Sequence, residues 1–184
     1  MPTITKWFNP TLKNWSEMMR ASFIALLLAA GITGCVQITK VGVGPRKELA
    51  TYSVSPTSPW NRLDTGRTVI WTKDGLGLQE LAFFKAVGDD QQLLNGRPGV
   101  EMPKFRADMR ATDIMDFVLA SMTAQGMQAV EGGRLRPYRF AGNRGFRFDM
   151  SYVTSGGNMM TAEVFGAVID DELHVVAYAG HPEF

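Results

Sequence analysis

Alternation of hydrophobic and polar positions dominates the C-terminal half of the chain and predicts an antiparallel sheet. Within residues 144–154, every second side chain from Phe146 to Tyr152 is aromatic or Met, as expected of a strand with one buried face. Residues 159–169 are apolar on both faces, which is typical of a central strand. The predicted strands are residues 52–54, 68–72, 78–87, 127–130, 135–140, 144–154, 159–169 and 173–179.

Short turn sequences connect these strands. Asp74-Gly75 is a strong hairpin signal, because both positions of such a turn require positive φ angles. The other predicted turns are Gly132-Gly133, Gly142-Asn143, residues 155–158 and Asp170-Asp171. Successive strands joined by such turns predict a meander.

Residues 112–125 have helical periodicity. Five side chains follow the i, i+3, i+4, i+7, i+8 spacing of a buried stripe: Ile114, Phe117, Val118, Ser121 and Met122. Thr112 is the predicted N-cap, and Gly126 is the predicted left-handed stop. A helix packed on an antiparallel meander predicts an α+β fold.

Residues 88–110 show no regular period, and this segment is longer than most connections in compact domains. Two interpretations remain open. The segment is either mobile and partner-facing, or an irregular connection that lies on the sheet with Phe105 as a buried plug.

The N-terminal region resembles a secretory signal. Arg20 precedes twelve uncharged residues, 21–32, and small residues then lead to Cys35, the single cysteine of the chain. The apolar run is too short to cross a bilayer, which needs about 20 residues. The alternatives are an ordinary secretory signal or a short buried helix, with Cys35 as an incidental thiol.

The end of this run, Ile32-Thr33-Gly34-Cys35, resembles the lipobox of bacterial lipoproteins. The resemblance implies that signal peptidase II recognises Ile32, Thr33 and Gly34, and that Cys35 becomes an acylated N-terminus. Two or more acyl chains would hold the protein stably at a membrane. Val36 follows in place of the aspartate that often retains such proteins at the inner membrane, which favours the periplasmic face of the outer membrane.

The sequence therefore predicts three parts. Residues 1–34 are a signal peptide, in which Met18 or Met19 is the predicted start and residues 1–17 an upstream extension. Residues 35–49 are a lipidated tether, and residues 50–184 are a single α+β domain. The formal net charge of the chain is only +1 at pH 7, which argues against general nucleic-acid binding.

No common catalytic, cofactor or metal motif occurs, so we expect a non-enzymatic protein with no cofactor. His174 is interpreted as a packed strand residue, and His181 belongs to a short tail after the last strand. The acidic run 170–172 is interpreted as a polar hairpin turn rather than a calcium loop, which needs several spaced oxygen ligands and a glycine.

One charge pattern carries a hypothesis about binding. Five arginines fall within fourteen residues without an acid among them: Arg134, Arg136, Arg139, Arg144 and Arg147. Arginine is suited to carboxylate, phosphate and lipid headgroups, so one interpretation is contact with an envelope protein or an anionic envelope polymer. The other is a solvated sheet face partly neutralised by Asp149 and Glu131.

A wider resemblance rests on the pattern Y-S-V…P-W-N…W-T-K-D-G…L-A-F-F…M-P-K-F-R-A-D-M…G-x-R-F-x-x-S-Y between residues 52 and 178. It is similar to a group of proteobacterial lipoproteins with a Mog1/PsbP-like fold. The resemblance implies a binding or assembly-support module. The alternative is a small periplasmic enzyme or a ligand carrier with a pocket between helix and sheet.

Overall fold

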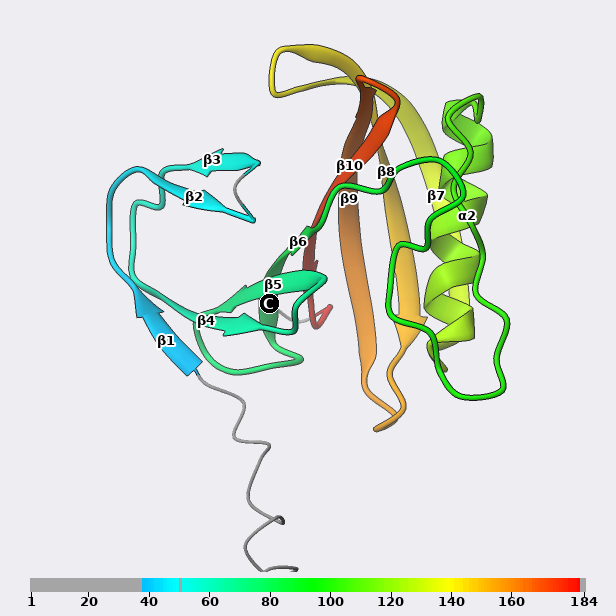
Figure 1. Ribbon diagram of the computed structural model, residues 1–184. Coiled ribbons are helices and arrows are strands. Elements are labelled where there is room, and N and C mark those ends of the chain that lie inside the picture. Colours follow the sequence, from blue (N-terminus) through cyan, green and yellow to red (C-terminus); the bar gives the residue numbers. More distant parts are fainter. Residues whose placement is uncertain (1–37, 50, 183–184) are drawn as a thin grey trace, which may run out of the picture. The chain divides into compact units, whose positions relative to one another are not determined.

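The structure is a computed structural model that describes residues 38–49 and 51–182, which belong to one compact unit (Figure 1). Its elements in chain order are β1 (Ile38–Val41), β2 (Arg46–Glu48), β3 (Tyr52–Val54), β4 (Trp60–Asp64), β5 (Thr68–Thr72), β6 (Gln79–Phe84), α2 (Ala111–Ala124), β7 (Gln128–Phe140), β8 (Asn143–Val153), β9 (Met159–Ile169) and β10 (Glu172–Gly180).

Eight of the strands in the described part of the chain form one sheet, in the order β1-β4-β5-β6-β10-β9-β8-β7. The strands β2 and β3 pair with each other in a separate hairpin. All pairings are antiparallel. Figure 1 shows α2 running alongside β7 against the sheet. The α+β class expected from the sequence is therefore confirmed.

The C-terminal strands agree best with the sequence pattern. Strand β9 has the predicted bounds, and β8 and β10 differ from them by one residue at each end. The apolar positions of β8 are all buried as predicted, at Phe146, Phe148, Met150 and Tyr152. Strand β9 lies between β8 and β10, which explains why both of its faces are apolar.

The predicted tether over residues 35–49 is wrong from residue 38 onward. Strand β1 pairs with β4 at the edge of the main sheet, and β2 pairs with β3. Val41 is fully buried, and Glu48 is 1% exposed because it pairs with Arg46 and Arg62 at N–O distances of 2.8 and 2.9 Å. These contacts with distant residues hold a segment whose local pattern is too short to predict strands.

The predicted turn at Gly132-Gly133 is also wrong. Strand β7 continues through both glycines, and the irregularity takes the form of two register shifts against β8. An added Cβ on Gly132 would lie 2.6 Å from a methyl carbon of Leu119 on α2. Gly132 therefore allows the helix to lie close to β7, rather than reversing the chain.

Two other turns differ from the prediction. The β5–β6 connection spans residues 73–78, and Gly75 has a positive φ of 117° whereas Asp74 does not, so this is not a two-residue hairpin turn. The β7–β8 turn is formed by Ala141 and Gly142, one residue earlier than predicted, with φ angles of 48° and 85°.

Helix α2 begins one residue earlier than predicted, and Thr112 is not its cap. The N-cap residue is Arg110, whose backbone N–H donates to the Asp113 carboxylate at 3.0 Å. The predicted apolar stripe is buried apart from Met122, which is partly exposed. Gly126 has a φ of 92°, as expected of a left-handed stop.

The sheet is covered on two faces by separate apolar clusters. Phe84 and Ala82 of β6 face the larger cluster, which contains α2 and the apolar face of β8. Phe83 and Leu81 face the smaller cluster, in which Trp71 is fully buried. Neighbouring side chains of β6 therefore face opposite clusters, as alternation along a strand requires.

The long segment after β6 contains no helix or strand between residues 88 and 110, yet it is anchored in the larger cluster. Phe105 and Leu93 are fully buried, and the Phe105 ring lies 6.1 Å from that of Phe117 on α2. The Phe105 backbone exchanges hydrogen bonds with Asp90 and Gln91 at 2.8 Å. The buried-plug interpretation is the one that fits these contacts.

Candidate functional site

A cavity of about 330 Å³ lies between α2 and the sheet. Its floor consists of four alanines, and its opposite wall includes Val118 and Met122 of α2. The floor residues are Ala82, Ala162, Ala177 and Ala179. The volume lies at the lower end of the range for small-molecule sites.

Strand register explains why small side chains gather under the helix. Ala82 of β6 pairs directly with Ala177 of β10, and Ala179 of β10 pairs with Ala162 of β9. Side chains directly opposite each other point to the same face, so the four methyl groups lie together under the helix. Larger residues surround the four alanines. The helix packs on these larger residues and would lose its contacts with them if it moved closer to the alanines.

Polar groups stand at the two ends of this apolar floor. Arg67 and Thr68 line one end, and Glu80 and Tyr152 line the other. Thr68 pairs with Phe84 and Thr72 pairs with Glu80, so the two ends are four residues apart along the strands. At the rise of a β-strand this is about 13 Å. The cavity is therefore apolar in the middle and polar at both ends.

The Tyr152 hydroxyl is an unusual feature of the site. Tyr52 and Tyr152 are both 8% exposed, and the Tyr52 hydroxyl donates to the Phe84 carbonyl oxygen at 2.7 Å. No hydrogen bond joins the Tyr152 hydroxyl to another residue of the described chain. Burial, with a smaller effect of the Glu80 charge, raises the pKa of Tyr152 to about 12. It is a neutral donor facing the cavity.

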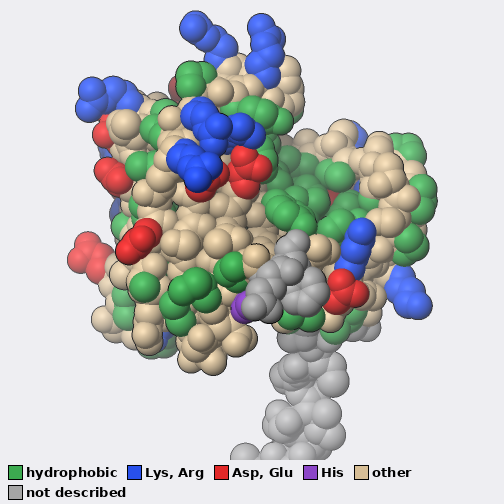
Figure 2. Space-filling view, turned by 180° about the vertical axis from the view of Figure 1, so that it is seen from behind, with side chains coloured by type: hydrophobic (Ala, Val, Ile, Leu, Met, Phe, Trp, Pro, Cys, Tyr) green, Lys and Arg blue, Asp and Glu red, His purple; other side chains and the backbone are tan. Residues whose placement is uncertain are grey.

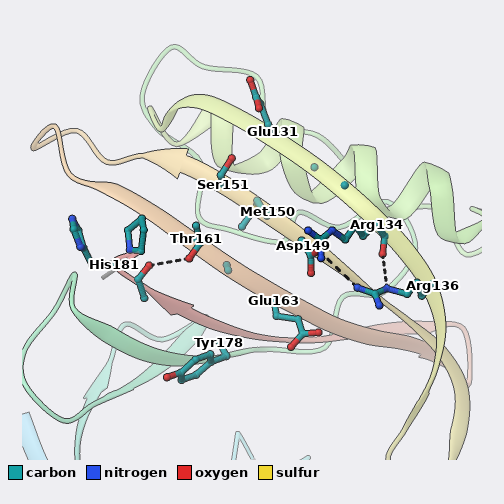
Figure 3. Close-up of a pocket in the computed structure, with 15 residues that line it drawn as sticks. Glu131, Arg134, Arg136, Asp149, Met150, Ser151, Thr161, Glu163, Tyr178 and His181 are labelled. Atoms are coloured by element: carbon teal, nitrogen blue, oxygen red, sulfur yellow. Dashed lines mark hydrogen bonds and ion pairs between the residues drawn. The ribbon is translucent and has the colours of Figure 1, made fainter. Parts of the chain in front are cut away.

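Three arginines of the cluster, Arg134, Arg136 and Arg147, lie on the other face of the sheet, along β7 and β8. Arg134 and Arg136 both approach the Asp149 carboxylate, at 3.3 and 3.9 Å, and Figure 3 shows their side chains turned toward it. Arg147 pairs with Glu163 at 2.8 Å and lies 5.8 Å from the Tyr138 ring. These arginines are neutralised within the sheet.

Register also determines which arginines meet. Arg136 pairs with Arg147, and Arg139 pairs with Arg144, across the β7–β8 ladder. Neither Arg139 nor Arg144 forms an ion pair with a described residue. In Figure 2, Lys and Arg side chains lie beside Asp and Glu side chains in the middle of the view, whereas those that project at the top have no acidic side chain beside them.

The open groove beside these arginines does not have the charge expected of an anion site. Glu131, Asp149 and Glu163 line it together with Arg134 and Arg136. Glu131 forms no ion pair with a described residue, and Figure 3 shows it apart from the Arg–Asp149 group, so its expected role in neutralisation is wrong. The geometry favours a solvated face with internal ion pairs.

His174 packs as the sequence predicts. It is 8% exposed, and its ring lies 6.1 Å edge-on to that of Tyr52. Burial lowers the pKa of His174, and the charges of Glu172 and Asp170 act in the opposite direction. His174 lines an aromatic groove with Phe140 and Phe165, which also contains Asp170 and Glu172.

The acidic run forms a hairpin turn. Asp170 and Asp171 both have positive φ angles, 50° and 61°, between the ends of β9 and β10. The described residues contain no group of three or more His, Cys, Asp or Glu side chains that could hold a metal ion. His181 lines the open groove, and its backbone N–H donates to the Leu78 carbonyl oxygen.

No described helix is long and apolar enough to cross a membrane.

Sequence reasoning identified the arginines and gave a pocket between helix and sheet as an alternative, but it named none of the residues that line the cavity. The alanines at positions 162, 177 and 179 give no sequence signal of a cavity, because a small residue in a strand has no pattern of its own. Arg67 belongs to no recognisable motif. The predicted lipidation site Cys35 and its recognition residues Ile32, Thr33 and Gly34 lie outside the described residues.

No known protein family, curated protein or solved structure matches this chain.

Proposed function

We propose that this protein is a lipid-anchored binding module of the bacterial cell envelope, with no catalytic activity, and that it holds an apolar ligand between α2 and the sheet. The Mog1/PsbP-like arrangement inferred from the sequence pattern is part of this proposal. It combines the binding role expected from the resemblance with the ligand pocket that was its alternative.

The observation that supports the ligand site is the alanine-floored cavity between α2 and the sheet. Protein interiors normally fill such volume with side chains, and an unfilled apolar space forfeits dispersion contacts. A bound apolar molecule would restore these contacts. The open arginine groove offers no comparable gain, because its charges already pair.

Filling the cavity tests this function. We expect Ala177→Leu to reduce binding of the neutral fluorescent probe N-phenyl-1-naphthylamine at least tenfold, because the larger side chain occupies the ligand volume. Thermal unfolding should show no loss of stability, since the added carbons enter empty space. Fluorescence titration measures the binding.

The matched control is Ala120→Leu, which makes the same change on the exposed side of α2. It should bind the probe within twofold of the unmodified protein. Failure of the unmodified protein to bind the probe, or equal binding by Ala177→Leu, would contradict the proposed ligand site.

The membrane anchor is a separate part of the proposal and rests on the lipobox resemblance at Cys35. Only two residues separate Cys35 from the start of β1 at Ile38. An extended chain of this length spans about 10 Å. An acylated Cys35 would thus leave little free chain between the lipid and the folded domain, in contrast to the expected fifteen-residue tether.

Intact mass spectrometry of the protein from membranes of its native host tests the anchor. We expect a mature chain that begins at Cys35 and carries acyl chains, and a precursor that accumulates when signal peptidase II is inhibited. A Cys35→Ser variant is the control and should remain unprocessed. Cleavage elsewhere, or an unmodified thiol in the soluble fraction, would refute the anchor and leave the cavity proposal standing.

A further inference from the structure

We propose that the cavity ligand is a single-chain amphiphile with an anionic headgroup, and that Arg67 binds this headgroup. The inference rests on the proposed ligand site and specifies its chemistry. It comes from the unequal polar groups at the two ends of the apolar floor.

Arg67 is a partly buried cation without an anionic partner. Its Nη2 donates to the Gln92 carbonyl oxygen at 2.5 Å, but its Nε–H is buried and has no hydrogen-bond acceptor. No carboxylate of the described chain lies within ion-pair distance of its guanidinium group. Seven of the other described arginines form ion pairs, namely Arg46, Arg62, Arg106, Arg110, Arg134, Arg136 and Arg147.

An unpaired buried N–H on a cation indicates a missing acceptor. Buried polar groups in folded proteins are nearly always hydrogen-bonded, and exceptions call for an explanation. The planar guanidinium group matches the two oxygens of a carboxylate or phosphate, and hydrogen bonds to charged groups are stronger than neutral ones. An anionic headgroup at this end would satisfy the Nε–H and neutralise Arg67 together.

The opposite end of the cavity disfavours an anion. Glu80 lines it, and its carboxylate accepts a hydrogen bond from the Gly77 N–H at 2.5 Å. The negative charge of Glu80 contributes to the raised pKa of Tyr152, so this charge acts at the same end of the cavity. An anionic headgroup would be repelled there, and an apolar tail would meet a neutral hydroxyl instead. The headgroup therefore lies at Arg67 and the tail extends over the alanines.

The size of the cavity limits the tail to one chain. A volume of about 330 Å³ is near the minimum for ligand sites, and the polar groups at its two ends are about 13 Å apart along the strands. A diacyl lipid would not fit within this space, whereas one medium-length alkyl chain would. Free fatty acids and single-chain alkyl phosphates share the required chemistry.

Calorimetric titration with dodecanol, dodecanoate and dodecyl phosphate, each below its micelle concentration, tests the inference. We expect both anions to bind at least tenfold more tightly than dodecanol, the effect of about one charge-assisted hydrogen bond. Arg67→Gln should weaken binding of the anions at least tenfold and leave dodecanol within twofold. Whichever anion binds more tightly identifies the headgroup as carboxylate or phosphate.

Two variants distinguish a specific headgroup site from other effects. Arg67→Lys keeps the charge but lacks the Nε–H and the planar guanidinium group, so it should retain only part of the preference for anions. Arg144→Gln removes an exposed arginine at the β7–β8 hairpin and should change nothing, which excludes a general effect of surface charge. Thermal unfolding of each variant confirms that it is folded.

The outcomes separate this inference from the proposed function. Equal binding of dodecanol and the anions, or an equal loss of all three in Arg67→Gln, would overturn the role of Arg67 while leaving an apolar ligand site. Absence of binding by all three ligands, together with failure of the neutral probe, would overturn the proposed function itself.

Discussion

Phe105→Ala is expected to lower the free energy of unfolding by about 3–5 kcal/mol, the cost of deleting a buried aromatic side chain. Phe105 is fully buried in the larger core cluster and contacts Phe117 of α2. Its removal leaves a void beneath a segment without helix or strand, where few other contacts can close it. Urea unfolding followed by circular dichroism measures the change.

Val100→Ala is the matched control for this change, since Val100 lies in the same segment but is 38% exposed. We expect it to alter stability by less than about 0.5 kcal/mol, as surface substitutions usually do. Similar small effects at both positions would mean that the segment is detached from the core in solution, and the mobile, partner-facing interpretation would then hold.

Gly145→Ala is expected to destabilise the fold by about 3 kcal/mol, at the upper end of the cost of overpacking. A Cβ at Gly145 in β8 would lie 2.2 Å from the backbone oxygen of Gly166 in β9. Backbone cannot rotate out of the way as a flexible side chain does, so the β8–β9 ladder would have to separate locally. Denaturant unfolding and amide hydrogen exchange in β8 and β9 measure the effect.

Gly133→Ala provides the control within the same sheet. A Cβ on Gly133 would meet no atom within 4 Å, and its φ angle is not positive. We expect a change within about 0.5 kcal/mol. If Gly145→Ala were equally mild, the close approach of the two strands at Gly166 would not exist in solution.

The sequence predicts best those elements whose hydrophobic periodicity lies within a short stretch of the chain. Strand β8 and helix α2 carry their periodicity within a dozen residues, so that burial of one face is readable locally. Strand β1 is four residues long and β2 three, and neither has room for a recognisable period. Their pairing with β4 and β3 depends on contacts with other segments.

The candidate site residues show the same difference between local and distant sequence signals. Arg136 and Arg147 were recognisable as a cluster because they lie near each other in the sequence, across one turn. The acids that neutralise them were harder to predict. Asp149, which pairs with Arg136, was expected, but Glu163, which pairs with Arg147, lies on the next strand and was not. The acids that decide whether an arginine cluster is free to bind anions lie on neighbouring strands.

The sequence by itself determined the antiparallel C-terminal strands, the helix with its buried stripe, and hence the α+β class. Tertiary structure alone decided the course of β7 through Gly132, the place of β1 in the sheet, and the cavity. The physical reason is that a cavity is a property of register. Ala82 and Ala177 come from strands far apart in the sequence, and only their direct pairing under α2 leaves the space that we propose to be occupied by a ligand.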